Sequence, residues 1–175
     1  MDKIPRMIHY CWFGNGEKPK FICDCINTWK AVLNDYEIVE WNESNFDINS
    51  NEYVKQAYEE KKFAYVSDYA RIKALYQYGG IYMDTDVMVY KSFNDLLDNQ
   101  CILGFEEEYY IATSFMACVP KHELIKEFID KYENVSFYNS DKSLDLTTNV
   151  QRLTQILEDR GLVRTNKFQK VEDIT

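Results

Sequence analysis

Two acidic residues, Asp84 and Asp86, stand one residue apart directly after the hydrophobic run Ile81–Met83. The apolar sequence continues to Tyr90 and predicts one strand through the acids, in which side chains at i and i+2 share a face and Thr85 points away. Two carboxylates on one apolar face repel each other unless a cation compensates them. Hard oxygen ligands suit Mn²⁺ or Mg²⁺, which leave positions open for phosphate oxygens. We therefore predict a divalent metal site that can bridge to a diphosphate.

A lone Asp-x-Asp motif is also typical of a solvated turn, so its surroundings decide its meaning. Here the pair follows a predicted helix and the helix-ending Gly79-Gly80. This order places the acids at the carboxyl end of a sheet strand, where α/β folds bind ligands. The surroundings favour the metal site.

Asp68 and Arg71 are three residues apart in the preceding predicted helix, so their side chains share one helix face. One interpretation is a surface ion pair, which stabilises a protein by about 0–1 kcal/mol. The other is functional: Arg71 contacts a diphosphate or holds Asp68, while Asp68 accepts hydrogen bonds from sugar hydroxyls. The sequence leaves both interpretations open.

Aromatic residues flank these polar positions. Trp12 ends the first predicted strand beside Gly14, where its indole could stack on a nucleobase or pack in the core. Tyr82 has the same two interpretations. His9 lies inside the apolar run of the first strand, which favours a core histidine over a catalytic base.

The elements that must position these residues alternate between strand and helix periodicity, which predicts an α/β fold with parallel βαβ units. In chain order they are a strand over 6–13, a helix over 19–33, a strand over 36–41, helices over 51–62 and 63–78, strands over 81–90, 101–105 and 111–119, and helices over 122–132 and 148–160. In the helix over 122–132, the apolar positions Ile125, Phe128 and Ile129 are expected in the core rather than against a membrane or a partner.

Composition narrows the class of function. A chain of 175 residues with 46% hydrophobic residues is expected to form one folded domain. With a net charge of −9 and without a basic run, no nucleic-acid partner is expected. The run Glu106-Glu107-Glu108 is expected to be a solvated turn, and the alternative is that it lines a site.

Location and cysteine chemistry are also predicted from the sequence. Without a signal peptide or an apolar stretch long enough for a transmembrane segment, the chain is expected in the cytoplasm, where it could be peripheral at the inner membrane face. The five cysteines then predict free thiols, and a zinc site at Cys23 and Cys25 is not expected.

Three blocks of sequence, taken together, resemble a known family. They are IHYCWFG over 8–14, FAYVSDYAR over 63–71 and YGGIYMDTD over 78–86. In this order and spacing they are similar to the DXD glycosyltransferases of family 32, which include capsular polysaccharide transferases and yeast outer-chain mannosyltransferases. The catalytic domains of large clostridial glucosylating toxins are more distantly similar. The resemblance covers most of residues 6–90, and the second half of the chain matches more loosely.

The resemblance implies a GT-A-like (Rossmann-like) nucleotide-diphospho-sugar transferase domain with a central, mostly parallel sheet. It further implies a Mn²⁺ or Mg²⁺ cofactor, a UDP- or GDP-sugar donor, a glycan or lipid-linked glycan acceptor and transfer with retention of configuration, plausibly in surface polysaccharide synthesis. By resemblance, Trp12 stacks on the base, Asp68 and Arg71 contact the donor sugar and phosphate, and Asp84 and Asp86 contact ribose, metal and diphosphate.

In the family, a C-terminal loop completes the metal and diphosphate site. We expect 1–175 to be a single GT-A-like domain in which that loop is missing or is supplied by the segment 146–149. Two alternatives stay open: a non-catalytic nucleotide-sugar-binding domain of the same fold, and a metal-independent glycoside hydrolase that uses paired carboxylates.

Overall fold

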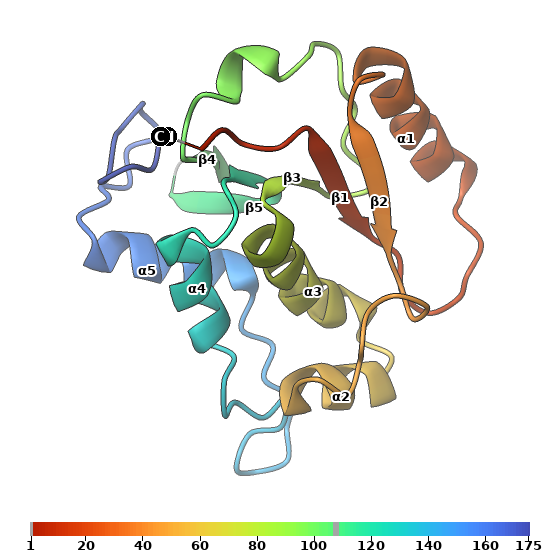
Figure 1. The fold of residues 1–175 in the computed structure, drawn as a ribbon. Helices are drawn as coiled ribbons and strands as arrows, with labels where there is room; N and C mark the ends of the chain where they lie inside the picture. The colour runs from red at the N-terminus through yellow and green to blue at the C-terminus, as the bar shows by residue number, and fades with distance from the viewer. Residues whose placement is uncertain (1, 107–108) are drawn as a thin grey trace.

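A computed structural model describes residues 2–106 and 109–175 and has a five-stranded sheet at its centre (Figure 1). The elements are β1 (Met7–Cys11), α1 (Lys20–Val32), β2 (Glu37–Trp41), α2 (Glu52–Glu59), α3 (Phe63–Tyr78), β3 (Gly80–Met83), the short 3₁₀ helix η1 (Asn94–Leu96), β4 (Cys101–Glu106), β5 (Tyr110–Cys118), α4 (Glu123–Asp130) and α5 (Asn149–Asp159). All ten predicted elements are present, with ends that differ by a few residues in most cases, and the α/β class is confirmed.

The strands lie in the order β2-β1-β3-β5-β4. β1 pairs parallel with β2 and β3, whereas β5 pairs antiparallel with both β3 and β4. Four of the five described strands therefore run in one direction, as expected of a mostly parallel sheet, and β5 alone is reversed, which makes the sheet mixed. The reason is the short connection between β4 and β5, because a parallel pair needs a crossover of a dozen or more residues.

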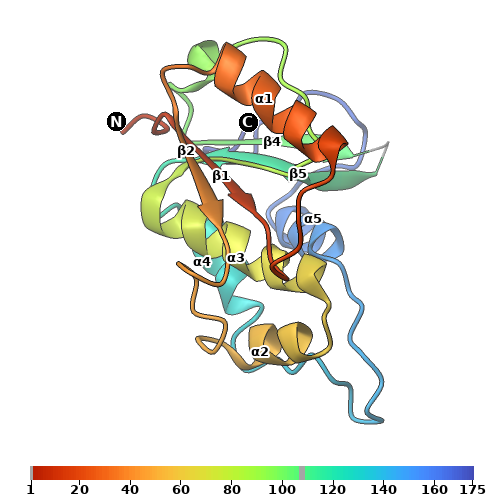
Figure 2. The same ribbon diagram turned by 90° about the vertical axis from the view of Figure 1, so that its right-hand side faces the viewer.

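Helices cover both faces of the sheet. Figures 1 and 2 show α1 over one face and α3, α4 and α5 over the other, with α2 packed on the far side of α3. Trp29 of α1 is fully buried in the smaller core, and Phe128 of α4 is fully buried in the larger one. Ile125 and Ile129 are buried beside Phe128, so the core assignment of that helix is confirmed. Among the described residues, no helix has the length and apolar character that crossing a membrane requires.

Two glycines join α3 to the central strand β3. Gly79 and Gly80 have φ of +65° and +93°, a region that other residues rarely adopt. A Cβ atom on Gly79 would lie 2.6 Å from the Cδ atom of Pro120, and one on Gly80 would lie 2.6 Å from the carbonyl oxygen of Met7. The glycine pair therefore allows the chain to reverse directly against its neighbours, which fixes where β3 begins.

β3 ends at Met83, so the predicted strand over 81–90 is wrong beyond that residue. The Asp84 amide donates to the Ser114 carbonyl (2.9 Å), and the Val87 amide donates back to the Asp84 carbonyl (3.2 Å) in a turn. Beyond the turn the chain follows α1, where the Trp29 indole donates to the Val87 carbonyl (2.7 Å). Acidic residues disfavour a strand interior, and here they occupy a turn at its carboxyl end.

Candidate active site

The turn that carries the two acids separates two hollows in the surface. One, of about 440 Å³, is lined mainly by apolar and aromatic residues, and the other, of about 640 Å³, is lined mainly by polar ones. Both hollows share Ala64, Arg71, Asp84 and Asp86 in their walls. Every residue predicted from the sequence to form the site lines at least one of the two hollows: Trp12, Asp68, Arg71, Tyr82, Asp84 and Asp86.

The two acids of the turn differ in their surroundings. Asp84 is partly buried, with 34% of its side chain exposed, and its Oδ1 atom accepts a hydrogen bond from the Tyr82 hydroxyl (3.0 Å) and faces Arg71. Asp86 is exposed. The prediction that both lie on one face of a strand is wrong in its geometry, because the turn places them. Both carboxylates nevertheless line the same two hollows.

Arg71 is the buried centre of the site. Its Nη2 atom lies 3.1 Å from Asp68, and its Nη1 atom lies 3.2 Å from Asp84 and donates to the Thr113 carbonyl (2.8 Å). Its Nε atom donates to the Ser67 carbonyl (3.3 Å). The Asp68 and Arg71 side chains are only 13% and 7% exposed, so the surface ion pair is excluded. Arg71 links α3, β5 and the acidic turn.

Asp68 faces the polar hollow from α3. Burial raises the pKa of its carboxyl to about 6, although the charges of Arg71 and Arg152 and a hydrogen bond with the Asn149 backbone oppose the rise. The negative charge of Asp84 adds to it. Asp68 is therefore a buried acceptor that titrates close to neutral pH, a property typical of functional sites.

The apolar hollow is formed where β1 ends, α1 begins and α3 begins. Phe13, Ile22 and Phe63 line it together with Trp12, which is partly exposed and donates its indole N–H to the Gly16 carbonyl (2.7 Å). A flat aromatic ligand can therefore reach the Trp12 ring. Tyr82 is different: its ring is 2% exposed and lies under the Arg71 guanidinium at 4.5 Å, so it packs in the core and reaches the site only through its hydroxyl.

The polar hollow adds residues that the sequence reasoning missed. Thr113 and Ser114 of β5 line it, and so do Thr148 and Asn149 at the start of α5. The Thr113 hydroxyl donates to the Asn149 side chain (2.8 Å). Polar residues in β5, at positions where a core strand would carry apolar ones, were the available signal. The segment 146–149 thus lines the polar hollow, through Thr148 and Asn149.

The sequence also led to predictions for the acidic run that begins at Glu106, for His9 and for the cysteines. Glu106 ends β4 and lines the polar hollow, which corrects its assignment to a solvated turn; Glu107 and Glu108 lie outside the described residues. His9 is a core histidine as predicted: its Nε2 atom lies 2.8 Å from the Gly79 carbonyl oxygen, and its Nδ1 atom accepts from the Trp41 indole. The cysteines are free, with Cys25 buried and Cys23 exposed.

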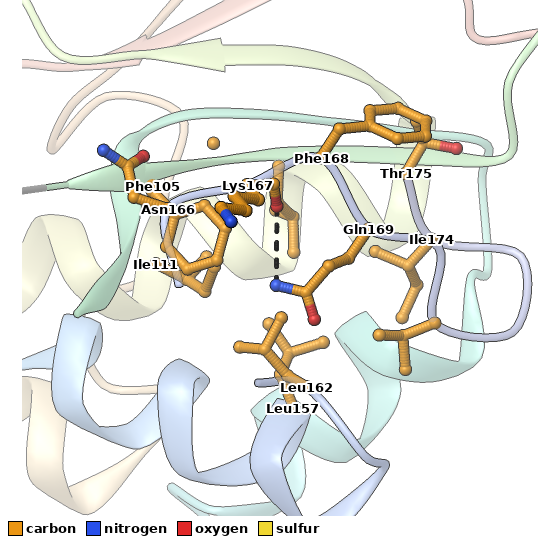
Figure 3. Close-up of a pocket in the computed structure, with 13 residues that line it drawn as sticks. Phe105, Ile111, Leu157, Leu162, Asn166, Lys167, Phe168, Gln169, Ile174 and Thr175 are labelled. Carbon is orange, nitrogen blue, oxygen red and sulfur yellow. Dashed lines mark hydrogen bonds between the residues drawn. The ribbon is translucent and has the colours of Figure 1, made fainter. Parts of the chain in front are cut away.

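A third hollow, of about 220 Å³, lies between β4, the end of α5 and the C-terminal segment (Figure 3). Leu103, Ile111, Leu157 and Ile174 line it, and at its rim the Gln169 amide donates to the Lys167 carbonyl (3.4 Å). Its described lining contains no Asp, Glu or His side chain. It therefore lacks the groups that the predicted chemistry requires.

The two carboxylates of the acidic turn suit a divalent cation that keeps water and phosphate oxygens among its ligands. Within the described part of the chain, no three His, Cys, Asp or Glu side chains are grouped closely enough to enclose an ion. Asp84 and Asp86 offer only two carboxylates beside two open hollows. This donor set suits Mg²⁺ or Mn²⁺, which bind through one or two carboxylates together with water and substrate phosphates.

Comparison with known proteins also identifies the part of the chain that contains the acidic turn. Residues 19–103 match the family model described as "Glycosyltransferase sugar-binding region containing DXD motif", and the DXD is Asp84-Thr85-Asp86. Over 150 residues the chain is 29% identical to inositol phosphoceramide mannosyltransferase 1 of Schizosaccharomyces pombe, covering 79% of this chain and 45% of that protein. Over 71 residues it is 34% identical to human lactosylceramide 4-alpha-galactosyltransferase, covering 38% of this chain and 19% of that one.

The chain thus spans less than half the length of these curated relatives. Among solved structures, the one titled "PaToxG Glycosyltransferase" superposes with a TM-score of 0.64 at 20% identity, covering 90% of this chain and 69% of that chain. The resemblance to DXD glycosyltransferases and the GT-A-like fold expected from it are confirmed.

Proposed function

We propose, from the premise that residues 19–103 form the DXD-containing sugar-binding region of a glycosyltransferase, that this protein transfers a sugar from a nucleotide diphosphate to a hydroxyl acceptor. The observation that carries the proposal is the pair of unlike hollows that share the acidic turn. A nucleotide sugar has the same three parts in the same order: an aromatic base, a charged diphosphate and a polar sugar. The apolar hollow, the acidic turn and the polar hollow thus follow one another in the order of the base, the diphosphate and the sugar.

The base of the donor lies in the apolar hollow against Trp12, because an indole face stacks on any base. The diphosphate lies at the turn, where a divalent cation at Asp84 and Asp86 offsets the repulsion between the carboxylates and the phosphates. The sugar then extends into the polar hollow toward Asp68, Thr113 and Asn149. In this arrangement each part of the donor meets side chains of matching polarity.

Arg71 orients the acids that face the donor. Its guanidinium has protein partners at Nε, Nη1 and Nη2, so it holds Asp68 and Asp84 in place while it lines both hollows. Asp68, ionised above a pH of about 6, accepts hydrogen bonds from sugar hydroxyls. Buried, partnered side chains of this kind stay in one geometry during the reaction.

In the reaction the bond between the sugar anomeric carbon and the diphosphate oxygen breaks, and a bond from that carbon to the acceptor oxygen forms. The acceptor hydroxyl loses its proton, and the diphosphate leaves with the bonding electrons. When bound, Mn²⁺ or Mg²⁺ supplies Lewis-acid stabilisation of the charge on the leaving group. The protein holds the sugar at Asp68, which orients the anomeric carbon for attack by the acceptor oxygen.

We further propose retention of configuration and a glycan or lipid-linked glycan acceptor. The relatives are named as a mannosyltransferase acting on inositol phosphoceramide and as an alpha-galactosyltransferase acting on lactosylceramide, which supports a glycolipid or glycan acceptor here. Retention is part of the family resemblance. The part of the polar hollow beyond Asp68, toward Thr148 and Val150, is open to an acceptor.

Two measurements test the proposal. Calorimetric titration of UDP and GDP in the presence of Mn²⁺ is expected to show binding of one nucleotide, which a chelator abolishes. Asp86→Asn should weaken this binding more than about 100-fold and leave the fold intact, since charged groups contribute several kcal/mol at such a site and Asp86 is exposed. Asp95→Asn, which removes an exposed acid paired with Lys91, is the matched control and should bind normally.

The outcomes separate the alternatives. Binding without release of sugar or transfer product, for any donor, would favour the non-catalytic domain. Cleavage of glycosides that is insensitive to chelator would favour the hydrolase. Full nucleotide binding by Asp86→Asn would remove the metal assignment.

A further inference from the structure

A second cluster of buried polar side chains lies near Asp68. Within the described residues, five buried side-chain polar atoms have no hydrogen-bond partner. Four of them belong to residues that surround Asp68: the hydroxyls of Tyr53 and Tyr132, the Nε atom of Arg152 and the Nδ2 atom of Asn149. Such atoms are rare in folded proteins, and their concentration at one place indicates a functional site.

The cluster joins three elements that are distant in sequence. Tyr53 comes from α2, Tyr132 follows α4, and Arg152 lies in the first turn of α5. The two tyrosine rings meet edge to face at 5.1 Å between centroids, and the Arg152 guanidinium lies 5.1 Å from the Tyr132 ring. Arg152 therefore packs against an aromatic support rather than extending into solvent.

Arg152 also holds a wall of the polar hollow. Its Nη2 atom lies 2.6 Å from Asp145, and these side chains are 15% and 18% exposed. Asp145 in turn accepts the Thr147 amide (3.0 Å) and donates its own amide to the Phe137 carbonyl (2.8 Å). The loop that this pair fixes leads directly into Thr148, which lines the hollow.

The charge of Arg152 acts on the same acid that Arg71 contacts. Both arginines lie close enough to the buried Asp68 to act on its charge, Arg71 from the same helix and Arg152 from α5. Only Arg71 makes a direct ion pair with it, so Arg152 acts through space and through the loop. The electrostatic interaction between Arg152 and Asp68 is strong for its distance, because little solvent screens the two buried charges.

We propose that Arg152 is a positioning residue for sugar transfer: through its ion pair with Asp145 in the loop that leads to Thr148, it fixes the α5 wall of the polar hollow. This inference rests on the proposed function. It concerns only the polar hollow, where the sugar is proposed to lie, since neither Arg152 nor the loop that it holds lines the apolar hollow. Nucleotide affinity and sugar transfer should therefore respond differently to its loss.

The test compares Arg152→Met with Arg164→Met. Arg164 is a matched control, because it also pairs with an acid (Glu158, 2.6 Å) and packs over a tyrosine ring (Tyr110, 5.0 Å), but its acid lies at the end of α5 and not in the loop before Thr148. Arg152→Met is expected to speed amide hydrogen exchange over residues 144–149 at least tenfold. It should also lower kcat for transfer at least tenfold, while the affinity for the free nucleoside diphosphate changes less than twofold. Arg164→Met should leave all three unchanged.

Further variants separate positioning from a general loss of structure. Arg152→Lys keeps the charge and should recover part of kcat, and Asp145→Asn should loosen the same loop if Arg152→Met does not fold. Unchanged exchange over 144–149, unchanged kcat, or an equal loss of nucleotide affinity would overturn the proposal. If the wild-type protein transferred no sugar from any donor, the proposed function would fail, while the exchange comparison would still decide whether Arg152 holds the wall.

Discussion

Replacement of Asp68 by Asn should stabilise the protein while it removes activity. Asp68 is buried, and its pKa of about 6 in the folded protein lies above the ordinary 3.8 of the unfolded chain. Below pH 4 the carboxyl is protonated in both states. As the pH rises toward 6, the unfolded chain ionises first, so the stability that the protonated form contributes is lost. An asparagine has the same shape and stays neutral at every pH.

The size of the gain follows from the two pKa values. The difference between about 6 and 3.8, at about 1.36 kcal/mol for each pH unit, gives about 3 kcal/mol at pH 7.5. At pH 4 the expected gain is less than about 1 kcal/mol by the same linkage, because the carboxyl is then largely protonated in the folded protein and partly so in the unfolded chain. In urea denaturation with chelator present, a typical slope of about 2 kcal/mol per molar converts the larger figure to a midpoint about 1.5 M higher.

The assay is urea unfolding of both proteins at pH 4, 6 and 7.5, followed by transfer activity at pH 7.5. Asp98→Asn is the control, because Asp98 is exposed and its pair with Lys3 is a surface one, so its effect should stay below about 0.5 kcal/mol at every pH. A gain that does not depend on pH, or a loss of stability at pH 7.5, would refute the reasoning about burial. Retained activity would refute the role of Asp68 at the sugar.

Two further predictions concern the apolar hollow and the stability of the fold. Trp12→Ala should weaken nucleotide binding by about 1–3 kcal/mol, which calorimetry would register as about a 5- to 150-fold rise in Kd, because the stacking face is lost. An unchanged Kd would place the base elsewhere; Phe168→Ala, at an exposed residue distant in sequence, is the control. Gly79→Ala should destabilise the fold by more than about 1 kcal/mol in thermal unfolding, because φ is +65° and the new Cβ would meet Pro120 at 2.6 Å. Gly16→Ala, with open space around it, should have a much smaller effect.

Local periodicity was sufficient to predict most of the elements. The helix over 63–78 has the observed ends, because the glycine pair terminates it and β3 follows directly. The strand after it was overextended, since Val87 and Val89 look like strand residues but pack beside α1. Hydrophobic patterning identifies burial, and only tertiary contacts decide whether a buried apolar segment pairs in a sheet.

For the site, the residue types were predictable and their partners were not. The sequence indicated Asp68, Arg71, Asp84 and Asp86, and the structure brings all four to one place. Nothing local indicated that Arg71 would join Asp68 to Asp84 and to the Thr113 carbonyl, because that contact connects positions 42 residues apart. Such long-range contacts arise from topology and cannot be inferred from spacing along one helix.

The shared wall between the two hollows has a consequence for how donor preference can diversify. The apolar hollow is built by residues between Cys11 and Asp86, whereas the polar hollow also uses residues between Glu106 and Val150. If the sugar lies in the polar hollow as proposed, substitutions in β5 or at the start of α5 can alter the sugar that is accepted and leave the residues of the apolar hollow, where the base is proposed to bind, unchanged. Exchange of the segment after Val87 between such enzymes is then expected to transfer the choice of sugar and leave the choice of nucleotide with the recipient, so each specificity can be inherited as a separate unit.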